Sequence, residues 1–226
     1  MIKFICNAQL NTLPSPDNLK RWKISRSLPD GFKKISDKCS LCNQSPATLG
    51  HVLCYCTYIH NDANFNRPKW RHDRVLVKLL NDIELLNTNF EIHADLPGFH
   101  YDLSNLINTV QKPDLVLVDS NARHLTLLEL SCCMEEYAYS RQKEKLQRYE
   151  RLVCALKTIN YGVDFYAVEI TARGIVSTEV FWMFKNLGVT KNQINTMIEG
   201  LIFTVLDCSK KIFNARDNPV WQGYDD

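Results

Sequence analysis

Residues 112–133 read KPDLVLVDSNARHLTLLELSCC, and this stretch decides the fold. It holds two short runs rich in leucine and β-branched residues, 112–120 and 125–133, which are typical of β-strands. The polar residues between these runs favour a turn. We therefore predict a β-hairpin, which brings the side chains of the two runs next to one another.

Helical and strand patterns alternate on either side of this hairpin. We predict a helix at 136–158, a strand at 163–171, a helix at 177–187 and a last long helix that begins with a capping box of Thr190 and Gln193. A further helix is predicted at 68–86, ahead of the hairpin. The faces expected to be buried are His72, Leu76, Leu79, Ile83 and Leu86 in that helix and Ile194, Met197, Ile198, Leu201, Ile202 and Val205 in the last one. This order predicts an α/β fold in which helices flank a mixed sheet.

The composition is that of a globular protein, with 226 residues of which 45% are hydrophobic and 23% charged. The 27 basic and 25 acidic residues give a net charge of +2, so affinity for nucleic acid would depend on local patches and bound metal. No apolar run is long enough to span a bilayer, and the N-terminus lacks the apolar core of a signal peptide. We therefore expect a soluble protein with no membrane partner.

Nine cysteines, an odd number, indicate a reducing compartment in which clustered thiols bind metal. The spacing C-x2-C-x8-H-x4-C is met by Cys39, Cys42, His51 and Cys56. Tetrahedral zinc prefers such a set, with Cys54 as the alternative fourth ligand. We predict a structural zinc knuckle at 39–60, worth folding free energy on the order of 10 kcal/mol. The alternative is a chance grouping of buried cysteines around a core histidine.

Two acidic residues lie at matching places on the predicted hairpin. Asp114 heads the first strand, and Glu129 lies on the second. Carboxylates on rigid strands suit Mg²⁺ or Mn²⁺, and such an ion activates water for phosphodiester hydrolysis. Where this arrangement usually has a lysine, two residues after the glutamate, the chain has Ser131. The next helix instead offers Lys145 on one face with Tyr149, so we predict that these four residues, Asp114, Glu129, Lys145 and Tyr149, form a catalytic site.

Three of these residues, Asp114, Glu129 and Lys145, have a plain structural alternative. A single Pro-Asp dipeptide is weak evidence, and Glu129 could be a charge on an edge strand. Lys145 could extend to solvent from a helix that is rich in basic residues. Their combination in the order strand, strand, helix is what favours a nuclease.

A basic patch surrounds the start of the helix at 68–86. It comprises Arg67, Lys69, Arg71 and Arg74, and we predict that it binds phosphate groups. Trp70 would either stack on a base or anchor the helix. His72 is either a core histidine or a group that contacts DNA or the metal ion, and Asp73 has no assigned role.

These motifs, in this order, resemble the restriction-like endonuclease region, of the PD-(D/E)XK kind, of site-specific non-LTR retrotransposon proteins. The matching segments are Asn11-Thr12-Leu13-Pro14, the CCHC knuckle with His51-Val52-Leu53, Arg71-His72-Asp73, Lys112-Pro113-Asp114, Glu129, the K-x-x-K-Y positions Lys145, Arg148 and Tyr149, and Ala172-Arg173-Gly174. The resemblance covers about residues 8–190. It departs from the family at Ala47, where the knuckle usually has an acidic residue, and at Arg148, which replaces a lysine.

The resemblance implies a domain order and an activity. The order is a lead-in related to the thumb region at 1–38, the knuckle and the endonuclease domain at 65–213. Apart from the resemblance, the C-terminal position and polar composition of residues 214–226 predict a loosely held tail. The activity is nicking of double-stranded DNA in the nucleus to leave a 3′ hydroxyl that primes reverse transcription, with the element RNA as a further partner. Arg148 and Arg173 join the expected nucleic-acid contacts. The chain has no Tyr-x-Asp-Asp run of a reverse transcriptase, so we expect a fragment, a domesticated gene or a decayed copy.

Two other functions stay open from the sequence. A catalytically inactive nucleic-acid-binding module would keep the knuckle and the basic patch, and Ser131 in the lysine position favours it. A zinc-containing adaptor that binds other proteins is favoured only by the nearly neutral net charge.

Overall fold

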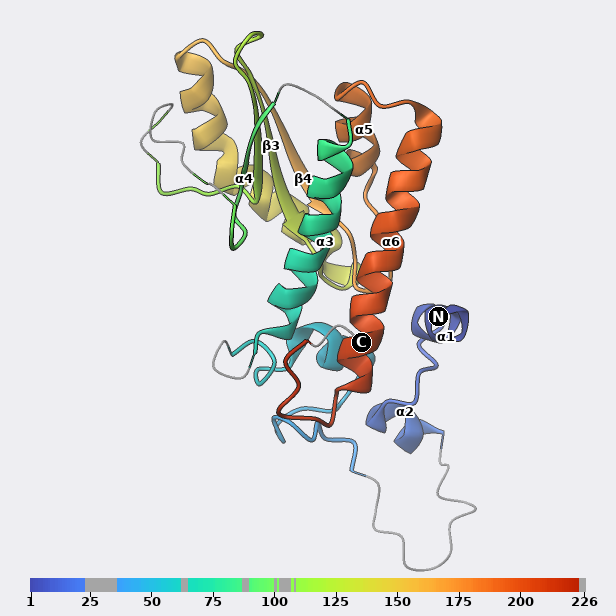
Figure 1. The fold of residues 1–226 in the computed structure, drawn as a ribbon. Coiled ribbons are helices and arrows are strands. Elements are labelled where there is room, and N and C mark those ends of the chain that lie inside the picture. The colour runs from blue at the N-terminus through green and yellow to red at the C-terminus, as the bar shows by residue number, and fades with distance from the viewer. Residues whose placement is uncertain are drawn as a thin grey trace, which may run out of the picture. The chain divides into compact units, whose positions relative to one another are not determined.

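The computed structural model describes residues 1–22, 36–61, 65–86, 90–99, 101, 107 and 109–223 (Figure 1). Residues 23–35 of the predicted lead-in and 224–226 of the predicted tail lie outside this description. The chain divides into two compact units, Met1–Arg71 with Val205–Asp226 (unit 1) and His72–Thr204 (unit 2). Helices α3 (Arg67–Glu84) and α6 (Lys191–Asn214) contribute residues to both units. Unit 2 is therefore shorter at both ends than the endonuclease domain predicted at 65–213.

Unit 2 is built on a four-stranded mixed sheet in the order β1-β2-β3-β4. The strands are β1 (Glu91–Ala94), β2 (Leu115–Asp119), β3 (His124–Ser131) and β4 (Gly162–Glu169). The first three pair antiparallel in sequence order, and β3 pairs with β4 in parallel. The predicted α/β class, the hairpin and the third predicted strand are confirmed, whereas the sequence pattern does not predict β1.

A tight turn sets the register of the hairpin. Asp119 Oδ1 accepts hydrogen bonds from the N–H groups of Asn121 at 3.0 Å and Ala122 at 2.9 Å. Aspartate suits this place because its short side chain reaches backbone donors two and three residues further on. The resulting register pairs Leu115 with Leu128. Asp114, one residue before Leu115, therefore lies opposite Glu129, one residue after Leu128, at the end of the hairpin.

Helices α4 (Glu135–Thr158) and α5 (Thr178–Asn186) lie on opposite sides of the sheet (Figure 1). The buried residues of α4 are Lys145, Tyr149, Leu152 and Leu156, the face that the helical period predicts. Tyr149 and Leu152 pack against Leu127 of β3 and Val163 of β4. Because strand residues alternate between faces, Glu129 and Glu169 also point to the α4 side.

The long helices follow their predicted patterns. Leu76, Leu79 and Ile83 of α3 have no exposed surface. At the start of α6, Gln193 Oε1 accepts a hydrogen bond from the Thr190 N–H at 3.2 Å, as expected of a capping box. Ile194, Leu201 and Val205 of α6 are buried, and Met197, Ile198 and Ile202 are half-buried. No helix among the described residues is long and apolar enough to cross a membrane.

Unit 1 contains the short helices α1 (Ile2–Gln9) and α2 (Pro16–Arg21), the π-helical turn η2 (His51–Tyr55) and the C-terminal segment. Residues 214–221 of this segment are not loosely held, as the sequence suggests, but packed within unit 1. Arg67 donates hydrogen bonds to the carbonyl oxygens of Ala215 at 2.8 Å and Asn218 at 2.5 Å. Trp221 packs edge-on against Trp70, with ring centroids 5.2 Å apart. Buried polar and aromatic contacts therefore hold residues 214–221 within unit 1.

Candidate functional site

Unit 1 brings the four predicted zinc ligands together. The Sγ atoms of Cys39, Cys42 and Cys56 and a ring nitrogen of His51 all lie within 4.8 Å of one another. Cys39 Sγ is 3.7 Å from Cys56 Sγ, and Cys42 Sγ is 3.4 Å from His51 Nε2. Bond lengths of about 2.3 Å to sulfur and about 2.0 Å to nitrogen place two sulfur ligands of a tetrahedral zinc ion about 3.8 Å apart and a sulfur and a nitrogen ligand about 3.5 Å apart. The donor atoms and their spacing therefore suit a metal ion such as zinc.

Local backbone geometry presents these ligands. Asn43 takes a left-handed φ of 56°, and its N–H donates to the Cys39 carbonyl at 2.8 Å, which closes the turn between the first two cysteines. Thr48 Oγ1 accepts the His51 N–H at 3.1 Å just ahead of η2. Cys54 is turned to a different partner, since its Sγ lies 3.2 Å from Arg71 Nη2. The structure therefore favours Cys56 over Cys54 as the fourth ligand.

The protonation of the cluster follows from burial and from nearby N–H groups. Burial lowers the pKa of His51, which favours the neutral imidazole that binds metal. Burial raises the pKa of Cys56 to about 12. Burial also opposes ionisation of Cys42, but the N–H groups of Gln44 and Ser45 outweigh it and lower the pKa. Cys42 is therefore the more readily ionised thiol, and binding of a cation would release protons from the cluster.

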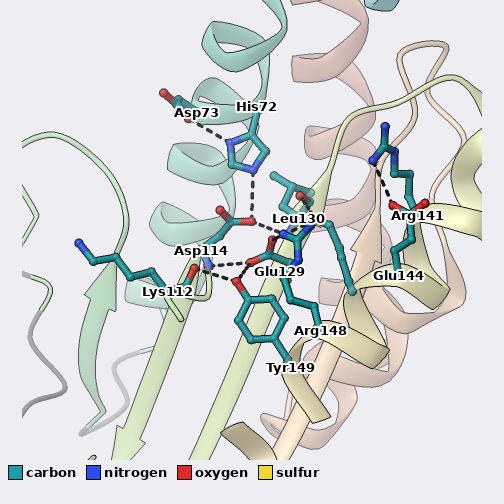
Figure 2. Close-up of polar contacts among 11 residues, drawn as sticks. His72, Asp73, Lys112, Asp114, Glu129, Leu130, Arg141, Glu144, Arg148 and Tyr149 are labelled. Carbon is teal, nitrogen blue, oxygen red and sulfur yellow. Dashed lines mark hydrogen bonds and ion pairs between the residues drawn. The ribbon is translucent and has the colours of Figure 1, made fainter. Parts of the chain in front are cut away.

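Unit 2 places the two predicted carboxylates side by side (Figure 2). The backbone N–H of Asp114 donates to Glu129 Oε2 at 3.3 Å, and the N–H of Leu130 donates to Asp114 Oδ2 at 2.6 Å. The two acidic side chains are only 16% and 10% exposed. Backbone donors on the hairpin therefore fix both carboxylates in a mostly buried position.

Helix α4 adds the amine and the phenol that its pattern predicts. Lys145 Nζ donates to the carbonyl oxygen of Leu130 and lies 3.5 Å from Glu129 Oε1. The Tyr149 hydroxyl is 2.9 Å from both Glu129 Oε2 and the carbonyl oxygen of Lys112, so its proton is donated to one of them (Figure 2). The helix, and not the strand position after Glu129, brings a lysine to the carboxylates.

His72 lies between two carboxylates, one of which is the predicted metal ligand Asp114. Its Nδ1 is 3.0 Å from Asp73 Oδ1, and its Nε2 is 3.2 Å from Asp114 Oδ2 (Figure 2). Burial favours the neutral ring, but the hydrogen bonds to Asp114 and Asp73 outweigh burial and raise the pKa to about 9. At neutral pH His72 is therefore a cation that donates to both neighbours, and Asp73 acquires a role in holding it.

The two carboxylates of the hairpin differ in pKa. Burial opposes ionisation of Asp114, but the hydrogen bond and charge of His72, with the charge of Lys145, outweigh it and lower the pKa. Burial and the charge of Asp114 raise the pKa of Glu129, and Lys145 only partly offsets them. Two buried carboxylates this close repel each other, and a divalent cation bound between them would relieve the repulsion.

Glu169 is a neighbouring acid that is not among the site residues predicted from the sequence. It is 2% exposed and pairs in register with Ser131 on the adjacent parallel strand. Burial raises the pKa of Glu169 to about 7, although the charge of Lys145 acts in the opposite direction. The signal was present in the sequence, because Glu169 shares alternate positions of its strand with the apolar Val163 and Ala167.

Two of the four predicted phosphate ligands in the basic patch are buried. Arg67 and Arg71 have no exposed surface, so neither guanidinium can reach a phosphate group in this structure. Arg67 is bound by carbonyl groups of the C-terminal segment and lies 5.2 Å from the Trp221 ring centroid. Arg71 donates to Ser209 Oγ at 3.3 Å and contacts the Cys54 thiol. Their roles are corrected to structural ones within unit 1.

The other predicted nucleic-acid contacts differ from Arg67 and Arg71 in their exposure to solvent. Lys69 and Arg74 are exposed, and the Arg148 side chain is 58% exposed and lies 3.9 Å from Glu129 Oε1. Arg173 is only 22% exposed, and its Nε lies 2.6 Å from Glu135 Oε2, so its charge is already paired. Among these residues Lys69, Arg74 and Arg148 present basic groups at the surface.

No protein-family model matches this chain, and no curated protein matches it as a relative. The candidate sites therefore stand on the sequence and on the geometry of the described residues.

Proposed function

We propose that this chain is a metal-dependent DNA endonuclease of the PD-(D/E)XK kind. The observation that carries the proposal is the cluster at the end of the β2–β3 hairpin. The backbone N–H of Asp114 binds the Glu129 carboxylate, and the Lys145 amine lies 3.5 Å from the same group. Two carboxylates and one ammonium in a mostly buried place are the groups that phosphodiester hydrolysis with a divalent cation requires.

Asp114 and Glu129 would hold a Mg²⁺ or Mn²⁺ ion, because they are the two strand-borne oxygen donors of the cluster. When bound, such an ion activates water and neutralises charge on the phosphate. Lys145 is held by the Leu130 carbonyl, where its charge stabilises negative charge that develops on phosphate oxygens. Tyr149 fixes Glu129 and His72 fixes Asp114, so neither carboxylate has to reorganise during the reaction.

Nicking of supercoiled plasmid DNA by the purified protein, with and without Mg²⁺, tests this function. Asp114→Ala and Glu129→Ala are each expected to lower the nicking rate at least about 100-fold. The matched control is Asp164→Asn, which removes a carboxylate from the opposite face of the sheet, where it pairs with His124. Unchanged nicking by either alanine variant, with circular dichroism intact, would remove the proposal.

We propose that the Cys39, Cys42, His51 and Cys56 cluster is a structural zinc knuckle. Its three sulfur atoms and one imidazole nitrogen match the preference of zinc, and their separations suit a tetrahedral ion. With four protein ligands, the knuckle leaves no ligand position for a catalytic water. Its contribution is therefore to folding.

We propose that the family is the one the sequence resembles, the restriction-like endonuclease of site-specific non-LTR retrotransposons. The support is the order of motifs from Asn11-Thr12-Leu13-Pro14 to Ala172-Arg173-Gly174. The protein would then act in the nucleus on double-stranded DNA, with element RNA as a second ligand, and each nick would carry a 3′ hydroxyl. Extension of the nicked plasmid by a DNA polymerase tests the end chemistry, and a nick that cannot be extended contradicts this assignment.

A second candidate function is a catalytically inactive nucleic-acid-binding module. The observation that favours it is that His72 and Lys145 already pair with the two carboxylates, so the cluster is satisfied without a cation. Ser131 in the usual lysine position also favours an inactive module. A gel shift that weakens with rising salt, without cleavage under Mg²⁺ or Mn²⁺, would support this function over the enzyme.

A further inference from the structure

Glu169 lies on the same side of the sheet as the hairpin cluster, one strand further on. In the parallel register of β3 and β4, Glu129 pairs with Ala167 and Ser131 pairs with Glu169. Paired residues of neighbouring strands project to the same face, and residues two apart on one strand share a face. The Glu129 and Glu169 side chains therefore both point toward α4, which carries Lys145.

The Glu169 carboxylate is buried but not fully paired. It is 2% exposed, and its Oε1 atom has no hydrogen-bond partner among the residues that the structure describes. Ser177 forms hydrogen bonds with both backbone polar groups of Glu169: the Glu169 N–H donates to Ser177 Oγ, and the Ser177 N–H donates to the Glu169 carbonyl. Lys145 Nζ donates to the carbonyl oxygen of Leu130, which precedes the Ser131 that pairs with Glu169, so the ammonium lies beside the neighbouring strand on the α4 side. A buried carboxylate oxygen left in this state is costly unless a charge is available to it.

The buried ammonium of Lys145 needs a negatively charged partner both with and without a divalent cation at Glu129. In the structure its ammonium lies 3.5 Å from Glu129 Oε1. If Glu129 held a divalent cation, its negative charge would be directed to that ion, and the ammonium beside it would lose part of its counter-charge. A buried ammonium without a counter-charge is strongly disfavoured, so cation binding at Glu129 would be favoured by a second carboxylate for Lys145.

We propose that Glu169 is a positioning residue that acts through Lys145, as the carboxylate that pairs with the ammonium when Glu129 binds the metal ion. This inference rests on the proposed metal-dependent function. Glu169 fits the role because it is a buried acid on the neighbouring strand, on the α4 side, and its Oε1 atom has no hydrogen-bond partner in the described part of the chain. It holds the amine close to the reacting phosphate without binding the ion itself.

The inference is tested by Mn²⁺ affinity, measured by isothermal titration calorimetry on zinc-loaded protein, in a double-mutant cycle. Glu169→Gln is expected to weaken Mn²⁺ binding about tenfold, because Lys145 can no longer leave Glu129 at low cost. In a Lys145→Met background, which has no ammonium to neutralise, Glu169→Gln is expected to leave Mn²⁺ affinity unchanged. Asp164→Asn, on the same strand and the opposite face, is the control and is expected to bind Mn²⁺ as the unaltered protein does.

Each outcome separates this inference from the function on which it rests. Equal loss of affinity from Glu169→Gln in both backgrounds would mean that Glu169 binds the ion or acts through the fold, and no loss in either would mean that it is uninvolved; both results overturn the inference. If Asp114→Ala leaves Mn²⁺ affinity unchanged, no ion binds at the hairpin, and the proposed function fails first. If Asp114→Ala abolishes binding while Glu169→Gln has no effect, only the role of Glu169 is lost.

Discussion

Asp114 and Glu129 are joined through the backbone of the hairpin that carries them. The Asp114 N–H donates to Glu129 Oε2 at 3.3 Å, while the N–H of Leu130, next to Glu129, donates back to Asp114 Oδ2 at 2.6 Å. This reciprocal arrangement holds two like charges together at the end of two paired strands. Such a pair persists only where cations compensate it, and His72 and Lys145 supply that charge from helices α3 and α4.

Lys145 is expected to affect the rate of cleavage rather than metal binding. Lys145→Ala should lower the plasmid nicking rate about 100-fold, because the variant lacks the fixed positive charge that the proposed mechanism directs at the phosphate. Mn²⁺ affinity measured by calorimetry should be retained. Lys143→Ala is the matched control, since Lys143 is exposed on the same helix. Equal rates for Lys145→Ala and Lys143→Ala would exclude Lys145 from the reaction.

The hairpin and the placement of Lys145 could be predicted because both are local. The two strands are joined by a turn of a few residues, so their pairing is fixed within one stretch of sequence. The helical period alone puts Lys145 on the face of Tyr149 and Leu152. Strand β1 was not predicted because Glu91–Ala94 has only four residues, too few to show an alternating pattern.

What the sequence could not show depends on contacts between distant segments. Arg67 is bound by carbonyl groups 148 and 151 residues later in the chain, whereas its charge and its basic neighbours in the sequence suggest an exposed patch. The placement of Glu169 beside Ser131, the residue after the Leu130 carbonyl that binds Lys145, depends on the parallel register of β3 and β4, which no local pattern specifies. The pairing of His72 with Asp114 likewise joins residues 42 positions apart.

The cysteine cluster predicts a zinc content that depends on Cys56 and not on Cys54. Cys56→Ser should lower the zinc-to-protein ratio measured by mass spectrometry from about one to well below it, and should reduce stability by several kcal/mol, because metal binding free energy is folding free energy. Cys54→Ser should keep the zinc, since a serine hydroxyl can accept the same bond from Arg71. Loss of zinc from the Cys54 variant alone would reverse the ligand assignment, and a chelator without effect on circular dichroism would remove the knuckle.

Arg67 and Lys69 form a matched pair of basic residues at the start of α3. Arg67→Ala should lower the free energy of unfolding by about 3 kcal/mol, because the carbonyl groups of Ala215 and Asn218 lose their donors inside unit 1. Lys69→Ala, at an exposed position, should change stability by less than about 0.5 kcal/mol. Urea denaturation measures both.

DNA binding should depend on Lys69 and not on Arg67, the reverse of the expectation for stability. If Lys69 contacts a phosphate, Lys69→Ala reduces the slope of log affinity against log salt by about one in a gel-shift series. Arg67→Ala should leave that slope unchanged in protein that remains folded, because the Arg67 side chain has no exposed surface. A changed slope for Arg67→Ala with an unaltered fold would restore Arg67 as a phosphate ligand.

Glu169 predicts a pH dependence of stability. Its pKa is raised from 4.5 to about 7, chiefly by burial, so the folded protein binds more protons at this carboxyl than the unfolded chain does between these pH values. Stability therefore falls as pH rises through this window, by about 3 kcal/mol in total, and the cost is fully present above the folded pKa. Below the unfolded pKa the carboxyl is protonated in both states and contributes no such cost.

Glu169→Gln removes this titration, so the variant should gain stability relative to the unaltered protein when the pH is raised. Urea denaturation of both proteins at about pH 5 and about pH 8 gives the difference in unfolding free energy at each pH, and the change in that difference isolates Glu169 from His72 and other titrating groups. Any effect of the amide on packing is the same at both pH values and cancels. A difference that does not move with pH would show that Glu169 ionises in the folded protein as it does in the unfolded chain, which contradicts a buried carboxyl with an unpaired oxygen atom.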